Sequence, residues 1–110
     1  MMEGLNKIEL RGYTGNVDIK AISNGLHITF SMCVPTVYNL ENSQFIDTEW
    51  FNVQYWVDPK ENPIVLKKGD WVEVVGRIKI NKYVDVSNKV ANIVLVIANK
   101  VKVLGDGKNS

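Results

Sequence analysis

A chain of 110 residues has room for one domain, which buries roughly two-thirds of the surface that its unfolded form exposes. With 45% hydrophobic and 23% charged residues, a net charge of +1 and no apolar run of membrane-spanning length, the composition is that of an ordinary soluble domain and identifies no strongly acidic or basic partner. The single cysteine, Cys33, excludes an internal disulfide, and the N-terminus lacks a secretory signal, so a cytoplasmic protein is expected.

Glycine residues and a tight turn organise the first part of the chain. An alternating segment predicts a strand from about Leu5 to Tyr13, and Gly12 and Gly15 permit a sharp bend there. A short extension from Ile19 to Ile22 leads to Ser23-Asn24-Gly25, where Asn-Gly is the strongest short signal for a β-hairpin.

The second strand is predicted from Leu26 to Val34 and has one apolar face. That face consists of Ile28, Phe30, Met32 and Val34. Pro35 is expected to close the strand, because proline cannot donate a ladder hydrogen bond. The polar segment from Thr36 to Asp47 then predicts a long flexible hairpin loop.

Aromatic residues occur on both faces of the third predicted strand, Thr48 to Trp56. Side chains alternate along a strand, so one face holds Phe51, Val53 and Tyr55. The other face holds Trp50, Asn52, Gln54 and Trp56. The first set is typical of a core, whereas two indoles among polar groups make neither a good core nor an ordinary solvated surface.

The connection to the fourth strand is broken twice by proline. Asp58 to Pro63 leaves room for at most a short turn of helix, and Lys67-Lys68-Gly69-Asp70 forms a turn into a strand from Trp71 to Ile80. Gly76 indicates a bulge or a barrel corner within that strand. Asn81 to Lys89 predicts a second polar hairpin loop.

The last predicted strand, Val90 to Leu104, is apolar on much of both faces, as in a strand buried on two sides or at a subunit contact. Five strands with glycine-marked corners and two long hairpins favour an all-β barrel, the five-stranded oligonucleotide/oligosaccharide-binding (OB) fold. A two-sheet sandwich needs about seven strands. Residues 1–104 are expected to form the barrel, and residues 105–110 a short flexible tail.

No arrangement of residues predicts catalysis or cofactor binding. His27, the only histidine, shares the outward phase of its strand with Cys33, and a nucleophilic pair would require the two to face each other. A surface histidine and a partly covered cysteine are the simpler interpretation. The carboxylates lack the spacing of an acid/base pair or a metal site, and no glycine-rich phosphate loop is present.

The outward indoles of Trp50 and Trp56 predict a nucleic-acid interface. Six residues of extended strand separate them by roughly 20 Å, with Asn52 and Gln54 between them. Unpaired bases stack on such rings without demanding a particular sequence, while cations neutralise the phosphates. Two loop tyrosines and seven basic residues complete the candidate set: Tyr38, Tyr83, Lys7, Arg11, Lys20, Lys67, Lys68, Lys79 and Lys82.

Simpler roles remain open for parts of this set. Trp71 is expected in the core, and Trp56, beside a turn, alternatively caps the end of the barrel. Lysines in turns are most often only solvated. The joint placement of cations and aromatic rings favours the binding interpretation.

Short motifs occur in a specific order over residues 5–104. They are Asn6-Lys7-Ile8-Glu9-Leu10-Arg11-Gly12, Ser23-Asn24-Gly25, Thr48-Glu49-Trp50, Leu66-Lys67-Lys68-Gly69-Asp70, Val75-Gly76-Arg77-Ile78 and Lys82-Tyr83. In these motifs the chain resembles the bacterial-type single-stranded DNA-binding proteins. The resemblance implies an OB-fold homotetramer, associated with the nucleoid, that wraps single-stranded DNA with little sequence preference during replication, recombination or repair. It implies base stacking at Tyr38, Trp50, Trp56 and Tyr83, and backbone contacts at Lys7, Lys20, Lys67, Lys68, Lys79 and Lys82.

The sequence departs from the family pattern in three places. Asn52 and Asn81 stand where members commonly have arginine, which weakens phosphate contacts. Asp58 to Pro63 is shorter than the usual helix-bearing connector. The chain ends at Asn109-Ser110 without the acidic-tipped tail that recruits other enzymes, so it is either truncated or a short tail-less relative, and recruitment through a tail is not expected.

Two other functions compete with single-strand binding. An OB module for protein interaction or primosome assembly, with weak DNA affinity, is favoured by the low net charge and the missing tail. The four retained aromatic positions oppose it. An enzyme would need an undetected pairing of His27 with Cys33.

Overall fold

The computed structural model describes residues 2–60 and 64–106. All regular structure in these ranges is β-strand: β1 (Ile8–Ile22), β2 (Gly25–Leu40), β3 (Ser43–Val57), β4 (Trp71–Val84) and β5 (Val90–Gly105). The same ranges contain no helix with the length and apolarity needed to cross a membrane. Residues 61–63 of the predicted connector and residues 107–110 of the predicted tail lie outside the described residues.

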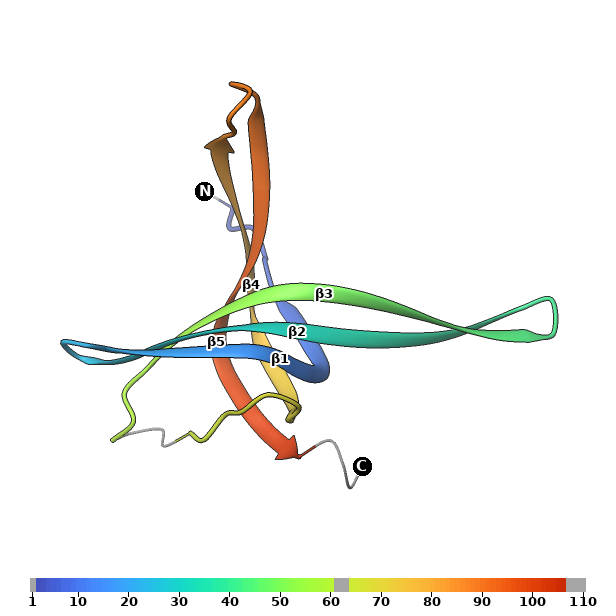
Figure 1. Cartoon of the computed structure of the whole chain (residues 1–110), viewed down its shortest axis with the longest axis horizontal. Coiled ribbons are helices and arrows are strands. Elements are labelled where there is room, and N and C mark those ends of the chain that lie inside the picture. The colour runs from blue at the N-terminus through green and yellow to red at the C-terminus, as the bar shows by residue number, and fades with distance from the viewer. Residues whose placement is uncertain (1, 61–63, 107–110) are drawn as a thin grey trace.

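The five strands close on themselves in the order β1-β2-β3-β5-β4 (Figure 1). β3 and β5 pair in parallel, and the other neighbouring strands pair antiparallel. The predicted all-β OB-fold is therefore confirmed.

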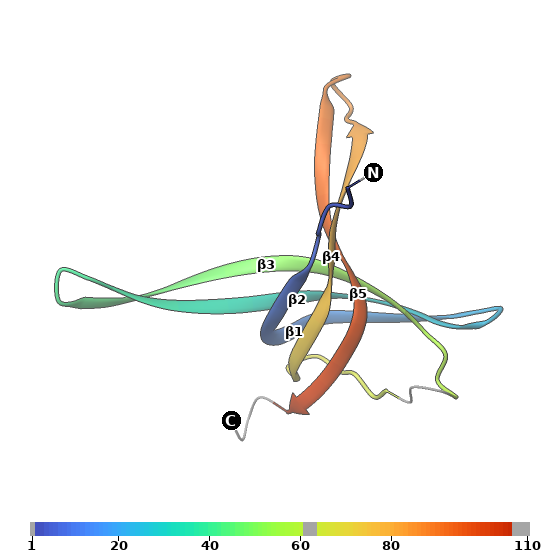
Figure 2. The same cartoon turned by 180° about the vertical axis from the view of Figure 1, so that it is seen from behind.

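Three hairpins project from the barrel as two-stranded ribbons. The β1–β2 and β2–β3 ends extend in opposite directions, and the β4–β5 ribbon stands across them (Figures 1 and 2). As a result the radius of gyration is 16.4 Å, against about 13 Å expected for a compact domain of this length.

The ribbons correct two predictions of flexible loops. β2 runs on through Pro35 to Leu40, and only Glu41 and Asn42, with φ of 49° and 64°, form the turn. Pro35 does not close the strand because β1 pairs with β2 only as far as Cys33, so beyond that point β2 is an edge strand that loses no ladder bond to proline. The second predicted loop, Asn81 to Lys89, likewise begins as strand and turns only after Val84.

β1 also differs from its prediction. It begins at Ile8 rather than Leu5 and is continuous to Ile22, with an irregularity between Thr14 and Val17 in place of a break. The bulge predicted at Gly76 is confirmed by a register shift between Val75 and Gly76 in the pairing with β5.

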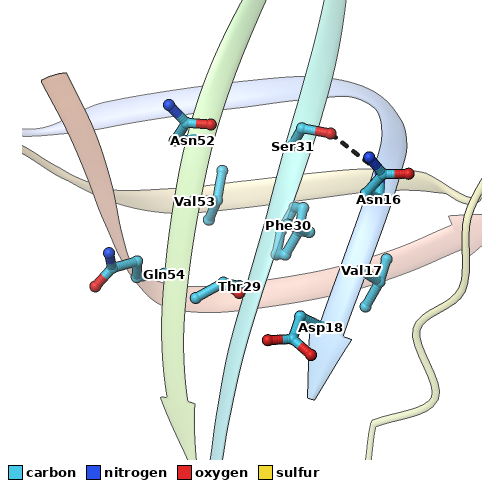
Figure 3. A pocket seen from close by; sticks show the side chains of 9 residues that line it. All are labelled: Asn16, Val17, Asp18, Thr29, Phe30, Ser31, Asn52, Val53 and Gln54. Carbon is cyan, nitrogen blue, oxygen red and sulfur yellow. Dashed lines mark hydrogen bonds between the residues drawn. The ribbon is translucent and has the colours of Figure 1, made fainter. Parts of the chain in front are cut away.

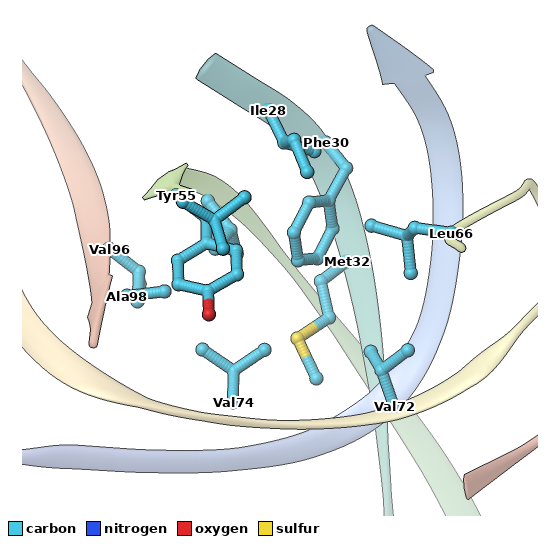
Figure 4. Packing of buried hydrophobic residues seen from close by; sticks show 11 residues of the cluster. Ile28, Phe30, Met32, Tyr55, Leu66, Val72, Val74, Val96 and Ala98 are labelled. Atoms are coloured by element: carbon cyan, nitrogen blue, oxygen red, sulfur yellow. The ribbon is translucent and has the colours of Figure 1, made fainter. Parts of the chain in front are cut away.

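The core lies inside the barrel and consists of the inward side chains of the strands together with one residue of the connector (Figure 4). Its members are Ile28, Phe30, Met32, Val53, Tyr55, Val57, Leu66, Val72, Val74, Val96 and Ala98. The predicted inner faces of β2 and β3 therefore do line the core, with Val34 and Phe51 partly buried against it.

A buried hydrogen-bond network fixes the connector to β1. The Thr14 hydroxyl donates to the Lys67 carbonyl at 2.6 Å and accepts from the Asp70 backbone N–H at 2.9 Å. The Asp70 carboxylate accepts from the Lys67 backbone N–H at 3.0 Å. The Lys-Lys-Gly-Asp motif thus has a structural role, and its backbone holds Lys67 and Lys68 exposed at the surface.

Candidate nucleic-acid interface

The outer face of β3 carries both indoles in the orientation that the alternation predicts. Trp50 is 62% exposed and Trp56 is 49% exposed. Asn52 between them is exposed and Gln54 is half-buried, while their neighbours Val53 and Tyr55 point into the core. About half of Trp56 faces solvent, so its ring is not sealed inside the barrel.

The registers of β2, β3, β5 and β4 continue this face across four strands. One row of side chains passes through Ser31, Asn52, Leu95 and Lys79. The next row passes through Thr29, Gln54, Ile97 and Arg77. Each row therefore leads from hydroxyl and amide groups to a cation on β4.

A hollow of about 330 Å³ opens between the two indole positions (Figure 3). Its polar lining comes from Asn16, Asp18, Thr29, Ser31, Asn52 and Gln54. The Asn16 backbone N–H donates to Ser31 Oγ at 3.1 Å, which leaves the serine hydroxyl hydrogen free to donate outward. Thr29, Asn52 and Gln54 make no side-chain hydrogen bond to any other described residue, so their polar groups are free for a ligand.

Three of the predicted basic residues lie in exposed ion pairs. Lys7 pairs with Glu9 at 3.2 Å, Arg11 with Glu73 at 3.2 Å, and Lys20 with Asp18 at 4.0 Å. Such pairs contribute little in water and exchange readily for a phosphate. Lys20 is the cross-strand partner of His27, which in turn pairs with Trp56. Arg11 lies where β1 pairs with β4, and Lys7 immediately precedes β1, so both are outside the four-strand face.

The remaining lysines divide between surfaces. Lys79 lies in the row of Asn52, while Lys82 alternates to the other side of the β4–β5 ribbon. Lys67 and Lys68 occupy the connector turn, outside that face. Arg77 is a candidate that sequence reasoning missed, although its alternation with Lys79 was a signal for it.

The two tyrosines predicted in loops lie in strands. Tyr83 shares the phase of Lys79 and Asn81 and extends the face along the β4–β5 ribbon. Tyr38 shares the phase of the core residues of β2 and stacks on Phe45, with ring centroids 5.7 Å apart. The four aromatic residues therefore do not form one stack.

The third tryptophan is only partly in the core. Trp71 is half-buried and packs on Tyr13, with centroids 4.5 Å apart and planes tilted by 55°. This contact lies at the start of β4, outside the hollow.

The strand that carries His27 and Cys33 keeps them apart. Six residues of β2 separate them by about 20 Å, and each faces a different tryptophan across the β2–β3 ladder. The Cys-His pairing considered from the sequence is therefore not formed. Among the described residues, no group of three or more His, Cys, Asp and Glu side chains is placed to hold a metal ion.

Known proteins share both the sequence and the fold. A model of the single-strand binding protein family matches residues 5–104. The single-stranded DNA-binding protein of Neisseria meningitidis serogroup A is 32% identical over 109 residues, which cover 96% of this chain and 62% of that protein. The chain thus spans less than two-thirds of the length of this curated relative.

Two solved structures extend the comparison. The Plasmodium falciparum SSB in complex with ssDNA is 26% identical, with a TM-score of 0.76 over 96% of this chain and 97% of its own. The small single-stranded DNA-binding protein of Streptomyces coelicolor, at 21% identity, shares the fold with a TM-score of 0.70 over 88% and 92% of the two chains. Because the family model covers nearly all of the sequence, the chain belongs to the single-strand binding protein family.

Proposed function

We propose that this protein binds single-stranded DNA with little sequence preference, by stacking bases on Trp50 and Trp56 and neutralising phosphates with nearby cations. The observation that carries the proposal is the pair of exposed indoles on one face of β3, with a polar hollow between them. Membership of the single-strand binding protein family supports it.

The chemistry of the face suits unpaired nucleotides. Each base stacked on an aromatic ring contributes about 1–3 kcal/mol whatever its identity, since every base has a flat face. Asn52, Gln54 and Ser31 offer hydrogen bonds to base edges in the hollow. Lys79 and Arg77 supply positive charge at the β4 end of the two rows, and Lys20 supplies it on β1, across His27 from Trp56.

Self-association is the second part of the proposal, as a homotetramer or a dimer. One face of the β4–β5 ribbon is largely aliphatic, with exposed side chains of Ile78, Ile80, Val84, Val90 and Val94 and the cross-strand pair of Lys82 and Asn92 among them. An apolar patch of this kind on a small domain marks an interaction surface. The side chains of this face alternate in step with the core residues Val74 and Val96, so the face continues the apolar core along the ribbon. A second copy that packs on the face would bury it.

The protein's biological role follows from its binding mode. We assign it to the protection of single strands in replication, recombination or repair, at the nucleoid, without catalysis. The competing assignment to protein interaction or primosome assembly is less favoured, because two exposed indoles share the outer face of β3 with the free amides that line the hollow.

A fluorescence titration with oligo-dT tests the binding. Stacking is expected to quench the emission of Trp50 and Trp56, and added salt is expected to reverse the quenching because phosphate contacts release counterions. A duplex of the same length is the matched control. Strong binding to the duplex or to a protein partner, with little affinity for oligo-dT, would favour the assembly module instead.

A further inference from the structure

His27 and Trp56 are cross-strand partners on the outer face of the β2–β3 ladder. Their rings are nearly parallel, with centroids 4.4 Å apart and planes 11° apart. The imidazole therefore covers one face of the indole, yet Trp56 stays 49% exposed. One face of the Trp56 indole therefore packs against His27, and the opposite face is open to solvent.

The Nε2 atom of His27 does not explain why a histidine occupies this position. Its Nε2 atom is buried and has no hydrogen-bond partner in the described part of the chain. A buried nitrogen without a partner is destabilising. The favourable contact that the structure does show for His27 is the flat surface that its ring offers to Trp56.

No aromatic ring of the described residues stacks on Trp50. Its cross-strand partner is Cys33, and its ring edge approaches Gly15, where a Cβ would lie 3.2 Å from Trp50 Cζ3. The two indoles thus differ in how they are held, although they lie on the same strand and the same face.

We propose that His27 is a positioning residue for single-strand binding: it holds the Trp56 indole in the orientation in which a base stacks on its exposed face. The inference rests on the proposed function, because it assigns a role to His27 only through Trp56. A ring that is held before binding loses less conformational freedom on binding, which increases affinity.

A double-mutant cycle separates this role from a direct contact with DNA. H27A is expected to weaken binding to oligo-dT about 2- to 10-fold, the effect of leaving one large side chain unrestrained. In the W56A background the same substitution should have no further effect, whereas in the W50A background it should have its full effect. H27F keeps a flat ring and should restore wild-type affinity.

A measurement without DNA reports the stack itself. In a W50F/W71F variant the only indole is Trp56, and its nanosecond fluorescence anisotropy reports how freely the ring moves. H27A should add a fast depolarising motion that H27F does not. H27F should also unfold at a temperature no lower than wild type, because it removes the buried unpaired nitrogen.

The outcomes distinguish the two proposals. Wild-type protein that does not bind oligo-dT would overturn the proposed function. If wild type binds and W56A weakens binding, an H27A variant of unchanged affinity and unchanged anisotropy would overturn the positioning role alone. If H27A still lowers the affinity for oligo-dT in the W56A background, the positioning role would also be overturned, because His27 would then contact the DNA itself.

Discussion

Gly15 lies beside the ring edge of Trp50 and beside the Ser31 hydroxyl: a Cβ at residue 15 would overlap Ser31 Oγ and come within 3.2 Å of Trp50 Cζ3. The irregular pairing of β1 between Thr14 and Val17 brings the glycine backbone this close. The absence of a side chain at Gly15 therefore makes room both for the Trp50 ring and for Ser31, which lines the polar hollow.

G15A is accordingly expected to cost about 1–3 kcal/mol of unfolding free energy by overpacking and to weaken oligo-dT binding by displacing Trp50. Denaturant unfolding and a binding titration measure the two effects. G4A is the matched control, since a Cβ at residue 4 would meet nothing within 4 Å. Adding S31A to G15A should recover part of the lost stability; identical behaviour of G15A and G4A would contradict the packing described.

Asp18 places a carboxylate in the lining of the hollow, 4.0 Å from Lys20. D18N removes a charge that repels phosphate and frees Lys20, so oligo-dT affinity should rise by about 0.3–1 kcal/mol at low salt and less at high salt.

The control for D18N is E9Q, which removes the acid of the similarly exposed Lys7–Glu9 pair outside the hollow. Affinity titrations at two salt concentrations compare the variants. An equal gain in E9Q, or weaker binding by D18N, would mean that the strand does not pass over the hollow.

The sequence alone could place the inner and outer faces of β2 and β3, because strict alternation separates Phe30 and Val53 from Trp50 and Trp56. It could not place Arg77 opposite Gln54 across β5. That relationship depends on the parallel pairing of β3 with β5, which leaves no local pattern, and on the exact register of β4 with β5. Gly76 indicated the bulge in β4 but not which residues pair beyond it.

The ribbons were mispredicted for a related reason. Pro35 and the polar residues after it carry the local signals of a loop, but a two-stranded ribbon outside the barrel tolerates both. The stack of His27 on Trp56 likewise follows from the β2–β3 register, which pairs two residues that are 29 positions apart in the sequence. The alternation of side chains within one strand cannot predict such a pairing.

Ile80 and Val94 are cross-strand partners on the aliphatic face of the β4–β5 ribbon, 60% and 50% exposed. If this face binds a second copy, I80K and V94K should each shift the protein toward smaller species, because a charge would be buried at the contact. Sedimentation velocity over a concentration series measures the shift. V86K, at the fully exposed ribbon tip, is the control; assembly unchanged in I80K and V94K would exclude this face.

Asp85 organises the tip of the β4–β5 ribbon. Its Oδ1 accepts hydrogen bonds from the Ser87 hydroxyl at 2.7 Å, the Ser87 backbone at 2.9 Å and the Lys89 backbone at 3.0 Å. The Ser87 hydroxyl bond, followed by the Lys89 backbone bond, lowers the pKa of Asp85 below its ordinary value.

Because the pKa of Asp85 is lowered in the folded turn, order at the tip should be complete above the ordinary aspartate pKa of about 3.9 and lost as pH falls through the lowered value. The Ser87 and Lys89 amide resonances should titrate together in NMR spectra, and D85N should abolish this titration. A midpoint at or above the ordinary aspartate value would contradict the hydrogen bonding described.

The most direct measurement is the affinity of W50A and W56A for oligo-dT, with W71F as the control because Trp71 packs on Tyr13 outside the hollow. Base stacking on the outer face of β3 predicts that each alanine variant loses about 1–3 kcal/mol of binding free energy while W71F binds as wild type. Folded W50A and W56A variants that both bind as tightly as W71F would contradict it.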